Sequence, residues 1–226
     1  MNPMPGNWMA VFCETLTRGS RKMGLSLTRV QVEQMACHAA QLEKWNQHIN
    51  LTAIKGPAAL AHRHFLDAVA IQPYICNVNG QWMDMGTGGG FPGLPVKLMN
   101  PDIHMVLVDA SRKKIHFLKH VIRMLKIDGI EAIHGRVDDL HHDPGFAGQF
   151  DAVSARGLAG LDRLADLAGP LLAPEGMLYA LKSPSARQEI TDDLAKKFLI
   201  QWDDYELPES KEARSLVRLT QKQKSS

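Results

Sequence analysis

The strongest constraint on the fold is the alternation of strand-like and helix-like segments between residues 80 and 197. Short apolar runs with strand character occur at 81–85, 104–109, 130–134, 150–155 and 177–182. Helical periodicity separates them, at about 92–100, 111–127, 159–169 and 185–197. Strands that alternate with helices build a mostly parallel sheet covered on both faces. We therefore expect an α/β fold with a doubly wound, mostly parallel sheet.

The two ends of the chain have different patterns. Up to about residue 79 the apolar spacing is helical, and Thr28 with Gln31 forms a capping-box signal for one helix start. Further helical stretches are expected at 7–23 and 57–74. Two strand-like runs, 198–202 and 216–220, predict an antiparallel hairpin at the sheet edge. We divide the chain into a helical extension (1–79), a sheet domain (80–222) and a short disordered tail (223–226).

Composition limits the class of protein. The net charge is only +2, so a nucleic-acid partner would have to bind through a local basic patch. The three cysteines form no CxxC pair, which argues against a disulfide framework or a zinc ribbon. The adjacent His141 and His142 lack a second ligand cluster with metal spacing, so no metal site is expected. Without a secretion signal or a membrane-length apolar run, we expect a cytoplasmic protein.

The segment from Asp84 to Gly93 predicts a cofactor loop, because glycines follow a strand and precede a helix. Its first seven residues fit D-x-G-x-G-x-G, whereas the last six fit the dinucleotide fingerprint G-x-G-x-x-G. Asp109 closes the next strand, where ribose hydroxyls would be held, or it caps the helix that starts near Ser111. The glycine loop alone therefore fits two cofactors, S-adenosylmethionine and a nicotinamide dinucleotide.

Three features favour S-adenosylmethionine. Asp84 precedes the glycines, where a pyrophosphate would be repelled and the sulfonium and ammonium groups of S-adenosylmethionine would be attracted. Val137 and Asp138 follow the third strand, where a backbone N–H and a carboxylate can recognise an adenine ring. The run 150–153 (FDAV) is typical of the fourth strand in methyltransferases.

Several further motifs lie in both halves of the chain. They are Trp45-Asn46, Asn50-Leu51-Thr52, Arg63-His64 with Asp67, Asp84-Met85-Gly86-Thr87-Gly88, Phe91-Pro92-Gly93, Arg136-Val137, Ser154-Ala155-Arg156 and Gly176 ahead of Leu181-Lys182. With these motifs the chain resembles the bacterial RNA small subunit methyltransferase G family, also called glucose-inhibited division protein B, from about residue 24 to 220.

This resemblance implies a class I methyltransferase fold (Rossmann-like) with an N-terminal helical extension. It implies methyl transfer from S-adenosyl-L-methionine to N7 of a guanosine in the 530 loop of 16S rRNA (position 527 in rRNA numbering). The family precedent favours a 30S subunit or a late assembly intermediate as substrate. The motifs assign cofactor contacts to Gly86, Phe91, Val137, Asp138 and Arg156, to which the chemistry of the loop adds Asp84, Gly88 and Asp109.

Methylation of guanine N7 needs no general base, because N7 carries a lone pair and no proton. We therefore expect no catalytic acid–base residue and assign substrate positioning to Arg156, Lys182 and Arg63. The segment 111–127 also carries a row of cations, and two interpretations of it stay open. These side chains either contact RNA or form an ordinary solvated helix face. The cations are Arg112, Lys113, His116, Lys119, Arg123 and Lys126.

Overall fold

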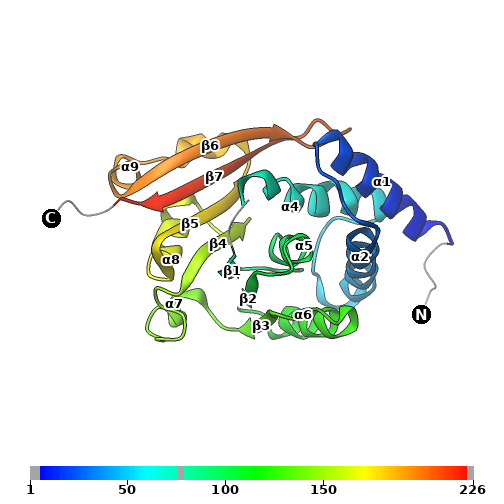
Figure 1. Ribbon diagram of the computed structural model, residues 1–226, viewed down its shortest axis with the longest axis horizontal. Coiled ribbons are helices and arrows are strands. Elements are labelled where there is room, and N and C mark those ends of the chain that lie inside the picture. Colours follow the sequence, from blue (N-terminus) through cyan, green and yellow to red (C-terminus); the bar gives the residue numbers. More distant parts are fainter. Residues whose placement is uncertain (1–5, 76–78, 223–226) are drawn as a thin grey trace.

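The computed structural model describes residues 6–75 and 79–222, so the tail expected at 223–226 lies outside the described residues. A seven-stranded sheet forms the centre of the fold, in the order β3-β2-β1-β4-β5-β7-β6 (Figure 1). The strands are β1 Gln81–Met85, β2 His104–Asp109, β3 Ile130–His134, β4 Phe150–Arg156, β5 Leu172–Lys182, β6 Phe198–Glu206 and β7 Ala213–Gln221.

Helices cover both faces of this sheet (Figure 1). Those of the N-terminal half are α1 Trp8–Lys22, α2 Arg29–Ile49, α3 Pro57–Leu60, the π-helix η1 Ala61–Leu66, α4 Asp67–Val69 and the 3-10 turn η2 Gln72–Tyr74. Those between the strands are α5 Gly93–Met99, α6 Arg112–Leu125, α7 Val137–Leu140, α8 Leu161–Ala168, the 3-10 helix η3 Pro184–Glu189 and α9 Asp192–Lys197. Within the described residues, no helix has the length and apolar character to cross a membrane.

The topology confirms the expected sheet. Strands β1 to β5 pair in parallel, whereas β7 pairs antiparallel with both β5 and β6. The C-terminal edge hairpin is therefore present as expected. Strand β1 has β2 on one side and β4 on the other, so the connections diverge at its carboxyl end. Open α/β sheets bind their ligands at such a switch point.

Strict alternation along the strands divides the core into two layers. Trp82 and Leu107 face one layer, which also contains the apolar faces of α1, α2, α5 and α6. Met83 and Val108 face the other layer, which contains apolar residues of α8 together with Leu194 of α9. The helical extension and the sheet therefore share one continuous apolar layer. The division at residue 80 stays a prediction.

The N-terminal helices begin and end where local signals place them. Thr28 accepts a hydrogen bond from the Gln31 N–H at 3.2 Å, and the Gln31 side chain accepts one from the Thr28 N–H at 2.9 Å, which confirms the capping box. Asn50 ends α2 in the left-handed conformation, a role that asparagine fills more readily than most residues. The apolar stripe of α2 is buried: Val32, Met35, Ala36, Ala39 and Leu42.

Two expected helices differ in detail from the expectation. The stretch 57–74 is helical as expected but changes type, from α3 through the π-helix η1 to α4 and, after a turn at 70–71, to η2. The stretch 185–197 divides at Ile190 and Thr191, which are extended, and the Thr191 hydroxyl accepts the Leu194 N–H at 3.1 Å as a new N-cap. Strands β5, β6 and β7 are longer than expected.

Candidate cofactor and substrate site

The glycine loop turns sharply at the carboxyl end of β1. Gly86, Gly88 and Gly90 all have positive φ, at 62°, 59° and 95°, a backbone region that only glycine adopts readily. The loop is also tied to the neighbouring strand, because the Thr87 N–H donates to the Val108 carbonyl at 3.0 Å. Gly86 lines the cavity above the strand ends, whereas Gly90 packs against Leu118 and Leu94 below the loop.

Asp84 lies beneath this loop and is fully buried. Its carboxylate accepts hydrogen bonds from the Thr87 hydroxyl at 2.6 Å, the Gly93 N–H at 3.0 Å and the Ser154 hydroxyl at 2.8 Å. Burial raises the pKa of Asp84 to about 6, and these hydrogen bonds limit the rise. Because Gly93 is the first residue of α5, the carboxylate occupies the helix N-terminus where a dinucleotide-binding fold would place its pyrophosphate.

A cavity of about 210 Å³ opens beside the loop, at the carboxyl ends of β1, β2 and β3. Asp109 lines it and accepts the Gly88 N–H at 2.9 Å and the Ser111 N–H at 2.8 Å. Asp109 therefore ties the glycine loop to the start of α6. The N-cap of α6 is Ser111 and not Asp109, so the capping interpretation of Asp109 is wrong, whereas its role in holding ribose hydroxyls stays a prediction. The lining residues are Gly86, Val108, Asp109, Ala110, Gly135, Arg136, Val137, Asp138, Leu158 and Leu167.

The far wall of the cavity comes from α7, where Val137 is buried and Asp138 is partly exposed. Arg163 of α8 pairs with the Asp138 carboxylate, and this hydrogen bond holds the pKa of Asp138 below its usual range. Leu158, which the sequence interpretation did not select, is 40% exposed and lines the same cavity. Four of the predicted cofactor residues, Gly86, Asp109, Val137 and Asp138, thus line one cavity, whereas Asp84, Gly88, Phe91 and Arg156 are not part of its lining.

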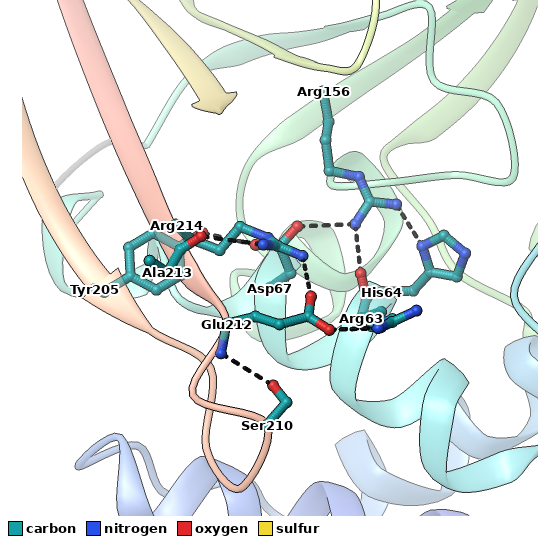
Figure 2. Close-up of polar contacts among 9 residues, drawn as sticks. All are labelled: Arg63, His64, Asp67, Arg156, Tyr205, Ser210, Glu212, Ala213 and Arg214. Atoms are coloured by element: carbon teal, nitrogen blue, oxygen red, sulfur yellow. Dashed lines mark hydrogen bonds and ion pairs between the residues drawn. The ribbon is translucent and has the colours of Figure 1, made fainter. Parts of the chain in front are cut away.

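Arg156 ends β4 and lies among residues from the N-terminal half, as Figure 2 shows. Its guanidinium donates to the Asp67 carboxylate at 3.1 Å, the Arg63 carbonyl at 3.2 Å and His64 Nδ1 at 2.6 Å. The guanidinium carbon also lies 5.1 Å from the centre of the Phe91 ring in the loop. Arg156 therefore connects the glycine loop to the helical extension.

His64 is held as a neutral ring. Because arginine can only donate, Nδ1 accepts from Arg156, so Nε2 carries the proton and donates to the Thr52 hydroxyl at 2.7 Å. Burial, the positive charge of Arg156 and the nearby His38 lower the pKa of His64 to about 3. The ring stacks on Phe91 with 4.6 Å between centroids. A doubly protonated His64 would have no lone pair to accept the hydrogen bond from Arg156, so this geometry excludes the imidazolium form.

His38 supports the loop from α2, and the sequence interpretation missed it. Its Nε2 lies 2.8 Å from the Gly89 carbonyl, and its ring stacks on Phe91 with 5.0 Å between centroids. Burial lowers the pKa of His38 to about 4. Its position in the sequence could have indicated this role. His38 lies three residues after Met35 and four before Leu42, on the buried face of α2, where a polar side chain needs a hydrogen-bond partner.

The C-terminal hairpin completes the polar network around Asp67 (Figure 2). The Tyr205 hydroxyl of β6 donates to the Asp67 carboxylate at 2.7 Å, and Arg214 of β7 lies 3.6 Å from it. Glu212 accepts hydrogen bonds from both Arg63 and Arg214. Three parts of the chain that are distant in sequence therefore meet at one carboxylate.

The two remaining predicted cations have partners within the protein. Lys182 donates to the Ala159 carbonyl at 2.8 Å and to Glu189 at 2.7 Å, so it ties the loop after β4 to η3. The Arg63 side chain is about half exposed and pairs with Glu212. Their roles in substrate positioning stay predictions. In the described part of the chain, no group of three or more His, Cys, Asp or Glu side chains could hold a metal ion.

Comparison with solved structures shows the same fold at low sequence identity. A SAM-dependent methyltransferase from Aquifex aeolicus superimposes with a TM-score of 0.51 at 12% identity, covering 70% of this chain and 90% of that one. This likeness concerns the fold, which is that of class I S-adenosylmethionine-dependent methyltransferases.

Similarity to proteins of known family extends over most of the chain. A ribosomal RNA small subunit methyltransferase G from Geobacter sp. (strain M21) is 37% identical over 209 residues, 90% of this chain and 95% of the relative. One from Streptococcus equi subsp. zooepidemicus is 40% identical over 178 residues, 78% of this chain and 74% of the relative. The family model for GidB, described as rRNA small subunit methyltransferase G, matches residues 31–217. The chain therefore belongs to the GidB family.

Proposed function

We propose that the protein transfers a methyl group from S-adenosyl-L-methionine to N7 of a guanosine in 16S rRNA, at position 527 in the 530 loop. Family membership supports the rRNA substrate, and the target atom is the one that the resemblance to this family implies. Such a substrate places the reaction in the cytoplasm, on a 30S subunit or a late assembly intermediate.

The position of Asp84 is the observation that carries the choice of cofactor. Its carboxylate already accepts the first N–H of α5, so the helix N-terminus offers no free site for a pyrophosphate. With Asp109 and Asp138 at the cavity, the surroundings of the loop contain three carboxylates. This arrangement disfavours an anionic dinucleotide and suits a ligand that carries a sulfonium and an ammonium group.

The residues around the cavity fit the parts of this cofactor. Asp109 has one oxygen on the Gly88 N–H and one on the Ser111 N–H, and each oxygen keeps a further lone pair that can accept a ribose hydroxyl. The Val137 N–H and the Asp138 carboxylate can recognise the adenine edge. At Gly86 a Cβ atom would lie 2.6 Å from the Leu158 side chain, so the glycine keeps this side of the cavity open.

The chemistry requires the protein to orient the reactants and to exclude water. When bound, S-adenosylmethionine supplies an electrophilic methyl group on sulfur. The N7 lone pair forms the new carbon–nitrogen bond as the carbon–sulfur bond breaks, so no proton moves and no general base is needed. The protein has to hold N7 about 3–3.5 Å from the methyl carbon and in line with the breaking bond.

Arg156 has the best position for contact with a bound reactant among the three predicted cations. It lies at a strand end beside Phe91, and its charge is largely balanced by Asp67. That balance suits the reaction, because positive charge develops on the guanine and a bare cation beside it would raise the barrier. Arg156 is assigned to the carboxylate of the cofactor or to a phosphate of the substrate. Arg63 and Lys182 are assigned to the substrate side.

Nucleotide-resolution mapping of N7-methylguanosine tests this function. Purified protein is incubated with S-adenosylmethionine and either 30S subunits that lack the modification or a naked 16S rRNA transcript. One new N7-methylguanosine in the 530 loop is expected, and a parallel reaction without S-adenosylmethionine is the control. Isothermal titration with S-adenosylmethionine and with NAD accompanies the mapping. Binding of NAD alone, or no new N7-methylguanosine on either substrate, would overturn the proposal.

A further inference from the structure

The outer face of α6 carries positive charge that no acidic residue on the same helix balances. No Asp or Glu occurs between Arg112 and Leu125, while Ile115, Phe117 and Val121 are buried against the sheet layer. The cations of α6 and its C-cap are exposed to solvent except Lys114, which is partly buried. They are Arg112, Lys113, Lys114, Lys119, Arg123 and Lys126.

Three exposed cations on other helices of the protein are paired with a carboxylate within one turn of the same helix. Arg18 pairs with Glu14 on α1, Arg29 with Glu33 on α2, and Lys197 with Asp193 on α9. On α6, by contrast, Lys114 is the one cation with an ion pair among the described residues, 3.6 Å from Asp109. An ordinary solvated helix face gains stability from such pairs, so their absence on this face leaves a concentrated positive field.

Part of this face forms a groove, which we call the basic groove. It encloses about 260 Å³, and its lining consists of Arg112, Ile115, His116 and Lys119 of α6 with His134 at the end of β3. Ile115 forms an apolar floor, and the other side chains present nitrogen atoms and no carboxylate. Glu131, on the same strand as His134, belongs to the opposite side of the pleat because the two positions differ by an odd number.

The basic groove adjoins the cofactor cavity. His134 Nε2 lies 3.1 Å from the Ala110 carbonyl, so its N–H donates to the residue that follows Asp109. Ala110 and Gly135, the neighbour of His134, both line the cofactor cavity. A polymer that crosses the basic groove would therefore pass beside the cofactor cavity, on the side that Ala110 and Gly135 line.

The arrangement of the cations in the basic groove indicates which class of ligand it can bind. Between Arg112 and Lys119 the helix rises about 10 Å, so the cations form a line rather than a single point. A membrane surface would need an exposed apolar face on the helix, and the apolar face of α6 is buried. We propose that the basic groove binds phosphate groups of the RNA backbone. This inference rests on the proposed function, because RNA is the partner which that function supplies.

The test measures how RNA affinity depends on salt for the double variant Arg112→Gln with Lys119→Gln. The probe is an unmodified 16S rRNA transcript, and the protein is the full chain saturated with S-adenosylhomocysteine. Each lost phosphate contact on a single-stranded segment should reduce the slope of log affinity against log salt by about 0.7. The double variant should therefore lose about 1.4 in slope and bind about 25-fold more weakly at 0.1 M salt, with unchanged affinity for S-adenosylmethionine.

A matched double variant, Arg21→Gln with Lys196→Gln, removes the same charge from two exposed cations that have no ion pair among the described residues. It should keep the parental slope. Equal losses in both double variants, or a parental slope in the groove variant, would overturn the inference and leave the proposed function standing. Failure of the parent protein to bind or methylate 16S rRNA would instead count against the proposed function.

Discussion

Replacement of Asp84 by asparagine separates the scaffold role of this residue from the effect of its charge. The amide oxygen can take the position that accepts the Thr87 hydroxyl and the Gly93 N–H, and the amide nitrogen can donate to the Ser154 hydroxyl. All three hydrogen bonds are then kept, with one reversed in direction. Asp84→Asn should fold normally, whereas Asp84→Ala leaves the buried Gly93 N–H without an acceptor at a cost of about 1–3 kcal/mol.

The pH dependence of this effect has a definite sign. The pKa of Asp84 is raised from 3.8 to about 6 in the folded protein, so the unfolded chain loses its proton first as pH rises. The contribution of the protonated Asp84 carboxyl to the free energy of unfolding is fully present below about pH 4 and is lost as pH rises from 4 to 6. The loss is about 3 kcal/mol at 1.36 kcal/mol per pKa unit. Asp84→Asn removes it, so the variant should gain up to about 3 kcal/mol relative to the parent between pH 4 and 7.

Urea unfolding of parent and variant at pH 4 and pH 7 measures this gain. Only the difference between the two proteins isolates Asp84, because the lowered pKa values of His38 and His64 change stability with the opposite sign over an overlapping range. Affinity for S-adenosylmethionine should fall about thirtyfold at pH 7, since a partly screened charge interaction of about 2 kcal/mol is lost. An identical stability difference at both pH values, or unchanged cofactor affinity, would refute the reasoning.

Three further changes test other parts of the site. Asp109→Ala should weaken S-adenosylmethionine binding by about 10- to 100-fold through the lost ribose hydrogen bonds, measured by calorimetry; unchanged methyl transfer would contradict the ribose assignment. His64→Phe keeps the stack on the loop but removes the acceptor for Arg156, so methyl transfer should fall at least about tenfold with cofactor saturating, while His64→Gln should restore part of it. Gly93→Ala would place a Cβ 2.5 Å from the Leu107 side chain and 2.8 Å from the Asp84 Cβ. This substitution should lower the free energy of unfolding by about 1–3 kcal/mol. Gly135→Ala, whose Cβ would meet open space, is the control and should leave the free energy of unfolding nearly unchanged.

The sheet could be predicted closely because its signals are local. Residues 81–85, 104–109 and 130–134 match β1, β2 and β3 at both ends; β1 and β2 are mostly buried, whereas only Ala132 is buried in the edge strand β3. The division of 185–197 was missed although Thr191, followed by two aspartates, carries an N-cap signal. The extra length of β6 and of the start of β7 comes from their pairing with each other, from Asp203↔Leu216 to Glu206↔Ala213, which the apolar pattern of either run alone does not report.

The site could be predicted only in part for a similar reason. Residues of the loop and strand ends lie at positions that the topology fixes, so Gly86, Asp109 and Val137 are found around one cavity. The partners of Arg156 come from another region of the chain, and no spacing rule relates residue 156 to residue 67. The buried location of Asp84, with its carboxylate on α5 rather than open to a ligand, likewise depends on how the loop folds back over it.

The network around Asp67 has a consequence for the order in which the protein matures. Asp67 and Arg156 are made well before Tyr205 and Arg214, which lie 138 and 147 positions after Asp67 in the sequence. A nascent chain that has completed all five parallel strands therefore still lacks two of the partners of this buried carboxylate. The hairpin is synthesised after the five parallel strands, so the hydrogen-bond network that holds Asp67 beside Arg156 is completed only when Tyr205 and Arg214 have been added.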